Sequence, residues 1–415
     1  MIPFYQPYFD RTELAAALHP GQGREDFELA VARAVGAAYG VAFAYGRSGL
    51  FTALKAMELE QSEVVMPAYT CAVVAQAVVA SGNRPVFVDI DPYDFNMNIA
   101  ELKNALTSRT RVILATHLYG YAADVDAIRS VAGDHRIVVI EDRAQSMFPV
   151  THGSDRLQGD LALCSFSLNK QLSSVQGGVI ATRSPDLGEK IRSFRDREMN
   201  QPSNRIRVAR WTRFVGSYLA FRQPAHGLLQ RARNLGGKRH YDEGDAWPVE
   251  LLPRDYAAVY TGFQARIGLV QLGKWDEIVA KRRDLAQLYD QELARIPGVQ
   301  AAPVVPGATF SYYTLRVPQR DQIDFCRRLR AQGVGSDQAY SYALPYLRAL
   351  REYARAEYPC ALQAAREVVN LPIYPGLSTQ QALYVAACVR RSLSQGLEQD
   401  LMPSTVHSQS GEVQS

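Results

Sequence analysis

The chain has 415 residues, of which 47% are hydrophobic and 21% are charged, and its mean hydropathy is −0.18. This composition is typical of a soluble globular protein and excludes fibrous, collagen-like and wholly disordered chains. The length allows two or three domains at roughly 100–200 residues each. The five cysteines include no Cys-x-x-Cys pair and no His-Glu-x-x-His motif occurs, so we expect neither a disulfide framework nor a metal site.

The net charge of +4 is unevenly distributed along the chain. Between Glu189 and His240 there are 13 lysine or arginine residues against 3 acidic ones, a local balance of +10, and the rest of the chain carries −6. A basic block in an acidic protein indicates a local anionic partner rather than nucleic acid. Nucleic-acid-binding domains usually have a basic face that extends over the whole domain. Neither a secretion signal nor a stretch of roughly 18–20 apolar residues is present, so we expect a cytoplasmic protein.

From about residue 24 to 185, helical and strand patterns alternate. Alanine-rich helical patterns over 25–39 and 49–57 are followed by short β-branched runs, which we predict as strands: Glu63–Met66, Arg84–Asp89, Arg111–Ala115 and Ile137–Glu141. Segments long enough for helices separate them, which predicts an α/β fold with a mostly parallel central sheet flanked by helices. In such sheets ligands bind at the carboxyl ends of the strands.

The segment over 194–250 interrupts this alternation and reads as an atypical basic insert. We assign it, with everything before it, to a large domain over residues 1–250. A long helix over 263–289, a strand over 309–317 and helices over 321–332 and 378–394 then predict a linking helix and a smaller α+β domain over 251–396. Residues 397–415 are polar without an apolar period, which predicts a disordered tail.

Three short segments together indicate chemistry. Ser48-Gly49 precedes a helix pattern, and the first N–H groups of a helix suit a phosphate, although such glycines also serve ordinary turns. Asp142 ends a buried strand, where it either caps a helix or pairs with a cation such as a protonated pyridine nitrogen. Lys170 is enclosed between an apolar run and a Gly-Gly turn, an unusual place for a lysine that suits imine formation with an aldehyde. Pyridoxal 5′-phosphate (PLP) needs all three features.

At these residues the chain resembles the sugar aminotransferases of the DegT/DnrJ/StrS type. The motifs that carry the resemblance are Ser48-Gly49, Pro67–Thr70, Pro85–Asp91, His117–Gly120, Glu141–Gln145, Ser165–Lys170, Gly177-Gly178, Gln264-Ala265 and Leu371–Tyr374. They span nearly the whole chain apart from the basic insert and the tail.

The resemblance implies a fold-type I PLP-dependent enzyme, usually a homodimer with both active sites at the interface. Such an enzyme moves an amino group from glutamate or glutamine to a keto sugar, usually nucleotide-linked, or to a related keto acceptor. The product serves the biosynthesis of a surface glycan, a lipid or a secondary metabolite.

The resemblance also implies roles for single residues. Lys170 would form the Schiff base and carry the proton, Asp142 would bind the pyridine nitrogen, and Gln145 would lie against the cofactor. Phosphate binding would fall to Ser165, Ser48 and Gly49 and to the backbone N–H groups of Leu50 and Phe51. The substrate candidates are His117, Tyr119 and Tyr340.

The chain departs from the family pattern at several of these places. Cys71 stands where an aromatic residue often stacks on the cofactor ring, so Tyr69 is the candidate for stacking. Leu50 replaces a threonine that would offer a phosphate its hydroxyl. Residues 257–259 lack the Asn-x-Arg pattern that reaches the neighbouring active site, and we expect a basic residue of the insert to replace it.

Alternatives stay open for the activity and for the insert. A sugar dehydratase or deoxygenase of the same fold is one, although such enzymes tend to replace the lysine with histidine, and a non-catalytic PLP-binding regulator is another. The basic and aromatic segment over 205–222 is interpreted as a dimer-interface helix, a site for substrate phosphate, or a helix for peripheral contact with an anionic membrane.

Overall fold

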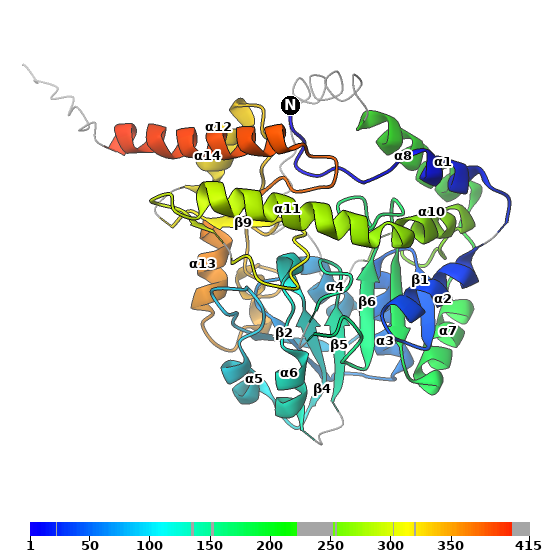
Figure 1. Ribbon diagram of the computed structural model, residues 1–415. Helices are drawn as coiled ribbons and strands as arrows, with labels where there is room; N and C mark the ends of the chain where they lie inside the picture. Colours follow the sequence, from blue (N-terminus) through cyan, green and yellow to red (C-terminus); the bar gives the residue numbers. More distant parts are fainter. Residues whose placement is uncertain are drawn as a thin grey trace, which may run out of the picture.

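A seven-stranded sheet forms the centre of the larger part of the molecule (Figure 1). The computed structural model describes all residues except 22, 134–136, 151–152, 222–251, 254, 302, 319–320 and 401–415. In spatial order the strands are β1 (Tyr39–Phe43), β7 (Gly178–Thr182), β6 (Leu161–Ser165), β5 (Val138–Asp142), β4 (Thr110–Thr116), β2 (Glu63–Pro67) and β3 (Arg84–Val88). Only β7 runs antiparallel to its neighbours, so the prediction of a mostly parallel sheet is confirmed.

Helices cover both faces of this sheet, as parallel strands require. One face packs against α3 (Gly46–Ala56), α4 (Ala72–Ala80) and α7 (Pro185–Glu198). The other packs against α2 (Arg24–Ala34), α5 (Ile99–Ala105), α6 (Val125–Ala132) and α10 (Gly262–Gly273). Alternate residues of one strand serve the two layers: Val41 and Phe43 of β1 face the first, and Ala42 faces the second. This alternation follows from the two-residue period of a strand.

The carboxyl-terminal part forms the smaller α+β unit that the sequence predicts. Its elements are α11 (Trp275–Leu293), β8 (Gln300–Ala301), β9 (Tyr313–Arg316), α12 (Gln322–Ala331), η2 (Leu344–Tyr346), η3 (Arg351–Tyr353), α13 (Pro359–Glu367), β10 (Val368–Leu371) and α14 (Thr379–Asp400). Buried Arg282 of α11 donates to the carbonyl oxygens of Phe310, Ser311 and Ile373. Because burial disfavours the charged form, the pKa of Arg282 is lowered to about 10.

Several element boundaries differ from the sequence-based prediction. The helix expected over 25–39 ends at Ala34. Gly36 has a φ of 75°, outside the helical region, and the chain then enters β1 at Tyr39, where it pairs with β7, a segment distant in the chain. The single helix expected over 263–289 is two helices, α10 and α11, which meet at Lys274. Helix α14 continues to Asp400, past the expected start of the tail at 397, and residues 401–415 lie outside the described residues.

The remaining described elements are α1 (Arg11–Leu18), η1 (Leu118–Gly120) and α8 (Asn204–Ala220). Helix α8 belongs to the basic insert and lies close to α1 (Figure 1). Within the described ranges, none of the helices combines the length and the apolar character needed to cross a membrane. The same ranges hold no group of three or more metal-ligating side chains.

Candidate active site

A cavity of about 200 Å³ opens where three parallel strands end. The last residues of β4, β5 and β6, which are Thr116, Asp142 and Ser165, all line it. Lys170 lies on the loop that follows β6 and lines the same cavity. The fold therefore brings together residues far apart in the chain because the carboxyl ends of parallel strands share one edge of the sheet.

Asp142 is buried at the end of β5, with 3% of its surface exposed. Its side chain accepts a hydrogen bond from the Ala144 N–H at 3.0 Å, and its carbonyl oxygen accepts one from the His117 N–H at 3.1 Å. Burial raises the pKa of the Asp142 carboxyl, while the Ala144 N–H and the nearby Lys170 charge oppose that rise. A cationic ring nitrogen placed in the cavity would favour the ionised carboxylate.

Lys170 is half-buried and sits on a loop that is closely tied to the sheet. Its N–H donates to the Ser167 carbonyl at 2.9 Å, and the Phe166 N–H donates to the Gly177 carbonyl at 2.9 Å. These bonds hold the lysine backbone in place between β6 and β7. The side chain can therefore reach the cavity from a position that does not depend on a flexible loop.

The start of α3 also lines the cavity, through Tyr45, Gly46 and Arg47. The helix begins at Gly46, with Tyr45 as its N-cap, and the Gly49 N–H already donates to the Tyr45 carbonyl at 3.2 Å. The free N–H groups of the first turn are therefore those of residues 46–48. The expectation that Leu50 and Phe51 supply N–H groups at the helix start is wrong, because both lie deeper in the helix, where N–H groups bond the preceding turn.

The phosphate candidates divide into two sets. Ser165 and Leu50 line the cavity, whereas Ser48, Gly49 and Phe51 do not. Gly49 serves packing instead, since a Cβ there would lie 2.9 Å from Ile180. The Ser48 hydroxyl is buried without a hydrogen-bond partner.

A close contact between α3 and β7 shapes this end of the cavity. A Cβ on Gly178 would lie 2.4 Å from the Gly46 Cα, a distance that no side chain allows. Glycine at 178 therefore lets the helix start approach the strand next to Lys170's loop.

Gln145 organises a group of buried tyrosines beside the cavity. Its Oε1 accepts from the Tyr119 N–H at 2.7 Å, and its Nε2 donates to the Tyr340 hydroxyl at 2.5 Å. The Tyr69 hydroxyl lies 2.8 Å from the Tyr119 hydroxyl. Gln145 and Tyr340 line the cavity, whereas Tyr69 and Tyr119 lie behind them. Cys71 also lines the cavity, so the cysteine and not Tyr69 occupies the wall.

His117 takes part in a buried ion network and does not line the cavity. Its Nδ1 accepts from the Ala123 N–H at 3.0 Å, which leaves Nε2 to donate to Glu141 at 3.2 Å. Glu141 also pairs with Arg143 at 2.7 Å. Although burial alone would raise it, the hydrogen bond from His117 and the charge of Arg143 lower the pKa of Glu141 from 4.5 to about 2. The network stabilises the strand end that carries Asp142.

Sequence reasoning missed several residues that line the cavity, among them Thr116 and Tyr45. The Thr116 hydroxyl is buried without a hydrogen-bond partner, and Tyr45 lies at the N-cap of α3. The polar residue after the predicted strand 111–115 was a usable signal for Thr116, because strand ends of this sheet carry the site. The Tyr45 hydroxyl donates to Asp255 at 2.7 Å, and burial together with this bond raises the pKa of Tyr45 to about 12.

These residues fit PLP. The cavity offers a half-buried lysine, a buried carboxylate with a single side-chain hydrogen bond, an unpartnered threonine hydroxyl and the free N–H groups of a helix start. An aldehyde, a ring nitrogen and a phosphate are the groups for which these donors and acceptors are suited.

The described part of the basic insert lies beside this cavity rather than in it. Arg210 of α8 is buried, donates to the Val259 carbonyl at 3.0 Å and lies 3.5 Å from Asp255, which holds Tyr45. Arg213 donates to Gln176 at 3.3 Å. Arginines of the insert thus reach residues next to the cavity wall without lining it.

The aromatic side chains of α8 point inward. Phe214 and Tyr218 are buried and Trp211 is half-buried, all three packed in one cluster with α1 and α10. They are therefore not exposed for insertion into a membrane, and only Val208 and Leu219 are large exposed hydrophobic residues of this helix.

Comparison with known proteins agrees with the geometry. Residues 8–221 and 233–390 match the DegT/DnrJ/EryC1/StrS aminotransferase family. GDP-perosamine synthase of Caulobacter vibrioides is 30% identical over 366 residues, 85% of each chain. UDP-N-acetyl-3-dehydro-alpha-D-glucosamine 3-aminotransferase of Acidithiobacillus ferrooxidans is 29% identical over 90% of this chain and 89% of its own. The crystal structure of S. venezuelae DesV with a ketimine intermediate superposes with a TM-score of 0.73 at 26% identity, covering 94% of this chain and 98% of DesV.

Proposed function

The chain belongs to the DegT/DnrJ/EryC1/StrS aminotransferase family, and we propose that it uses PLP to transfer an amino group from glutamate or glutamine to the carbonyl carbon of a nucleotide-linked keto sugar. The relatives named for GDP and UDP sugars support this class of acceptor. The amino sugar formed would enter a surface glycan, a lipid or a secondary metabolite.

One observation carries the proposal: Lys170, Asp142 and Ser165 line the same cavity together with the start of α3. Each is suited to a different part of PLP. Their convergence at one edge of the sheet supports a site in which the start of α3 would hold the phosphate and Asp142 would hold the ring nitrogen.

Each of these residues has a separate role in the proposed reaction. Bound PLP supplies the electron sink that makes a proton on the carbon beside nitrogen removable. The Nζ of Lys170 would take that proton and return it to the carbon on the other side of that nitrogen, acting as a general base and then as a general acid. The Asp142 carboxylate accepts a hydrogen bond from the ring N–H and keeps that nitrogen protonated. The Ser165 hydroxyl and the N–H groups of residues 46–48 bind the phosphate.

For the acceptor, Tyr340 is the one of the three sequence candidates that lines the cavity. Its hydroxyl accepts a hydrogen bond from the Gln145 side chain, so the donor on Tyr340 stays available to a sugar oxygen. His117 and Tyr119 support the wall from behind. A homodimer in the cytoplasm, as predicted from the sequence, completes the proposal and is testable by light scattering and by cell fractionation.

A two-stage spectroscopic experiment tests the function. Holoenzyme purified with PLP should lose the visible absorbance of the bound aldehyde form when glutamate or glutamine is added. The absorbance should return when a panel of keto-sugar nucleotides is added. Lys170→Ala should do neither, whereas exposed Lys103→Ala should behave as the parent protein.

Two outcomes would select the alternatives. Absorbance that no amino donor changes would support a PLP-binding regulator without turnover. Release of a deoxygenated sugar from the aminated enzyme would support the dehydratase reading.

A further inference from the structure

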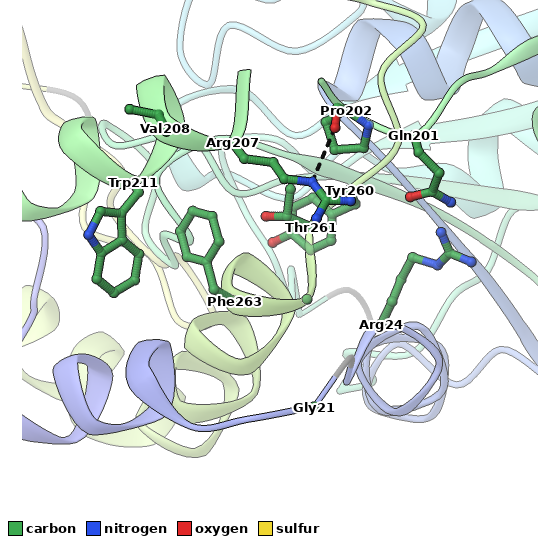
Figure 2. Close-up of a pocket in the computed structure, with 11 residues that line it drawn as sticks. Gly21, Arg24, Gln201, Pro202, Arg207, Val208, Trp211, Tyr260, Thr261 and Phe263 are labelled. Carbon is green, nitrogen blue, oxygen red and sulfur yellow. Dashed lines mark hydrogen bonds between the residues drawn. The ribbon is translucent and has the colours of Figure 1, made fainter. Parts of the chain in front are cut away.

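A second cavity, of about 450 Å³, lies between α8, the start of α10 and the start of α2 (Figure 2). It shares no lining residue with the cavity that holds Lys170. Its volume falls within the roughly 300–1,000 Å³ typical of small-molecule sites. Part of its wall comes from the basic insert, the segment in which this chain departs from its family.

Two arginines enter this cavity from different elements, Arg24 from α2 and Arg207 from α8 (Figure 2). No acidic residue is among the described residues that line it. Arg207 donates from Nε to the Pro202 carbonyl at 3.1 Å, and within the described residues it has no carboxylate in ion-pair range. Its charge is therefore available to a ligand.

The charge of Arg24 is also poorly compensated. Its Nε is buried without a hydrogen bond and lies 4.0 Å from Glu28. Glu28, however, pairs with Arg195 and lies 3.8 Å from Arg192. Arg195 has a second partner in Asp196 at 2.8 Å. Two carboxylates thus serve three guanidinium groups, and Arg24 has the longest of these ion-pair distances, which leaves positive charge at the edge of the cavity.

The start of α10 adds donors to the same space. Thr261, Gly262 and Phe263 line the cavity, and the first turn of this 12-residue helix contains no acidic residue. The N–H groups of Gly262 and Phe263, the first two residues of the helix, have no partner within it. A phosphate placed there would meet both these donors and the two arginines.

Aromatic rings form another wall. Trp211 and Phe263 are half-buried and lie edge to face, with ring centroids 5.4 Å apart. Figure 2 shows both rings on the side of Arg207 away from Arg24. An aromatic surface next to an anion site suits a ligand that carries both a planar ring and phosphates.

A wall separates this cavity from Lys170. Tyr260 lines the cavity, and its hydroxyl is hydrogen-bonded to the Ser174 hydroxyl. The Gln264 side chain donates to the Gln176 carbonyl at 2.7 Å, and a Cβ on Gly177 would overlap the Tyr260 ring. A ligand bound here therefore cannot take part in the reaction at Lys170 within the same subunit.

We propose that this cavity is a second binding site, for a nucleoside diphosphate. The phosphates contact Arg24, Arg207 and the first N–H groups of α10, and the base packs on Trp211 and Phe263. The site lies outside the catalytic cavity and does not rest on the activity proposed above.

Calorimetry on the PLP-loaded protein tests this site, with UDP and GDP as probes and uridine and pyrophosphate as partial ligands. Arg24→Gln and Arg207→Gln should each weaken binding of UDP or GDP at least tenfold. Trp211→Leu should weaken the binding of UDP and GDP but leave the affinity for pyrophosphate within twofold of the parent value. Arg205 is exposed on the same helix and does not line the cavity, so Arg205→Gln should change neither the affinity for the nucleotides nor the affinity for pyrophosphate.

Three results would overturn the proposal. The first is no binding of UDP or GDP at millimolar concentration. The second is binding that both arginine variants leave within twofold while their thermal melts match the parent. The third is binding lost in Tyr340→Phe and retained in the arginine variants, which would place the nucleotide in the catalytic cavity. The donor half-reaction should be unaffected in the arginine variants, so failure here is distinguishable from failure of the transaminase activity.

Discussion

The two cavities of this protein differ in the elements that line them and in how their charges are paired. The one at Lys170 lies at the carboxyl ends of parallel strands, and the charges behind it are paired: Glu141 with Arg143 and His117. The one at Arg207 lies between helices. Arg207 has no carboxylate in ion-pair range among the described residues, and Arg24 shares Glu28 with Arg192 and Arg195. Under the two proposals, the cavity for the reaction has fixed surroundings with paired charges, whereas the cavity with less compensated charge is suited to binding an anion.

The largest difference between the two cavities should appear in how substitutions change the rate of amino transfer. Lys170→Ala should reduce amino transfer by roughly 10³-fold or more, because it removes the proton-carrying group. Arg207→Gln should leave the rate within twofold, because Arg207 does not line the catalytic cavity. Stopped-flow absorbance with saturating glutamate measures both. A large loss of the amino-transfer rate in Arg207→Gln would contradict the separate roles proposed for the two cavities.

The paired charges behind the catalytic cavity should matter for stability. Glu141→Gln leaves Arg143 buried without its carboxylate and should lower the free energy of unfolding by about 3–5 kcal/mol. Exposed Glu277→Gln, which breaks the Glu277–Lys281 pair, should cost no more than about 1 kcal/mol. Urea unfolding at pH 7 compares the two variants.

The same carboxylate predicts a pH dependence. The pKa of Glu141 is lowered in the folded protein to about 2 from 4.5, so its contribution is present above pH 4.5 and is lost as the pH falls toward 2. Thermal melts of the parent protein should show this loss, and Glu141→Gln should have a flatter profile in that interval. If the melting temperatures of the two proteins fell in parallel with pH, that result would contradict a lowered pKa for Glu141.

The close approach of α3 to β7 should have an intermediate effect. Gly178→Ala places a Cβ 2.4 Å from the Gly46 Cα, so the start of α3 must move. We expect a loss of about 1–3 kcal/mol in stability and faster release of PLP on dialysis. In α8, nothing lies within 4 Å of a Cβ at Gly216, and Gly216→Ala should stabilise the protein by about 0.5–1 kcal/mol and retain PLP.

The last prediction concerns Asp255, which links the two regions. Asp255 accepts from the Tyr45 hydroxyl and lies 3.5 Å from Arg210. Asp255→Asn weakens the Tyr45 hydrogen bond and leaves buried Arg210 without the charge of its carboxylate, so it should cost about 1–3 kcal/mol in stability. It should leave the donor half-reaction within twofold. A tenfold loss of rate in this variant would mean that α8 is part of the catalytic machinery.

Predictions from the sequence succeeded where the signal was local. The β-branched runs over 63–66 and 84–89 are strands, and Asp142 and Lys170 lie at the cavity because strand-end and turn positions can be read from neighbouring residues. Strand β1 was missed because its pairing with β7, a distant segment, decides its conformation. The roles of Tyr69 and His117 were misplaced, since the direction of a buried side chain depends on its neighbours in space.

The sequence by itself determined the family, the mostly parallel sheet and the residues suited to PLP, because these depend on residue type, order and spacing. Only the tertiary structure decided where α3 begins, which residues line the cavity and where helix α8 of the basic insert packs. The uneven charge of the chain is an example. Its arginines are countable in the sequence, but whether each one is paired depends on carboxylates brought near by folding, and for Arg24 and Arg207 too few are brought near.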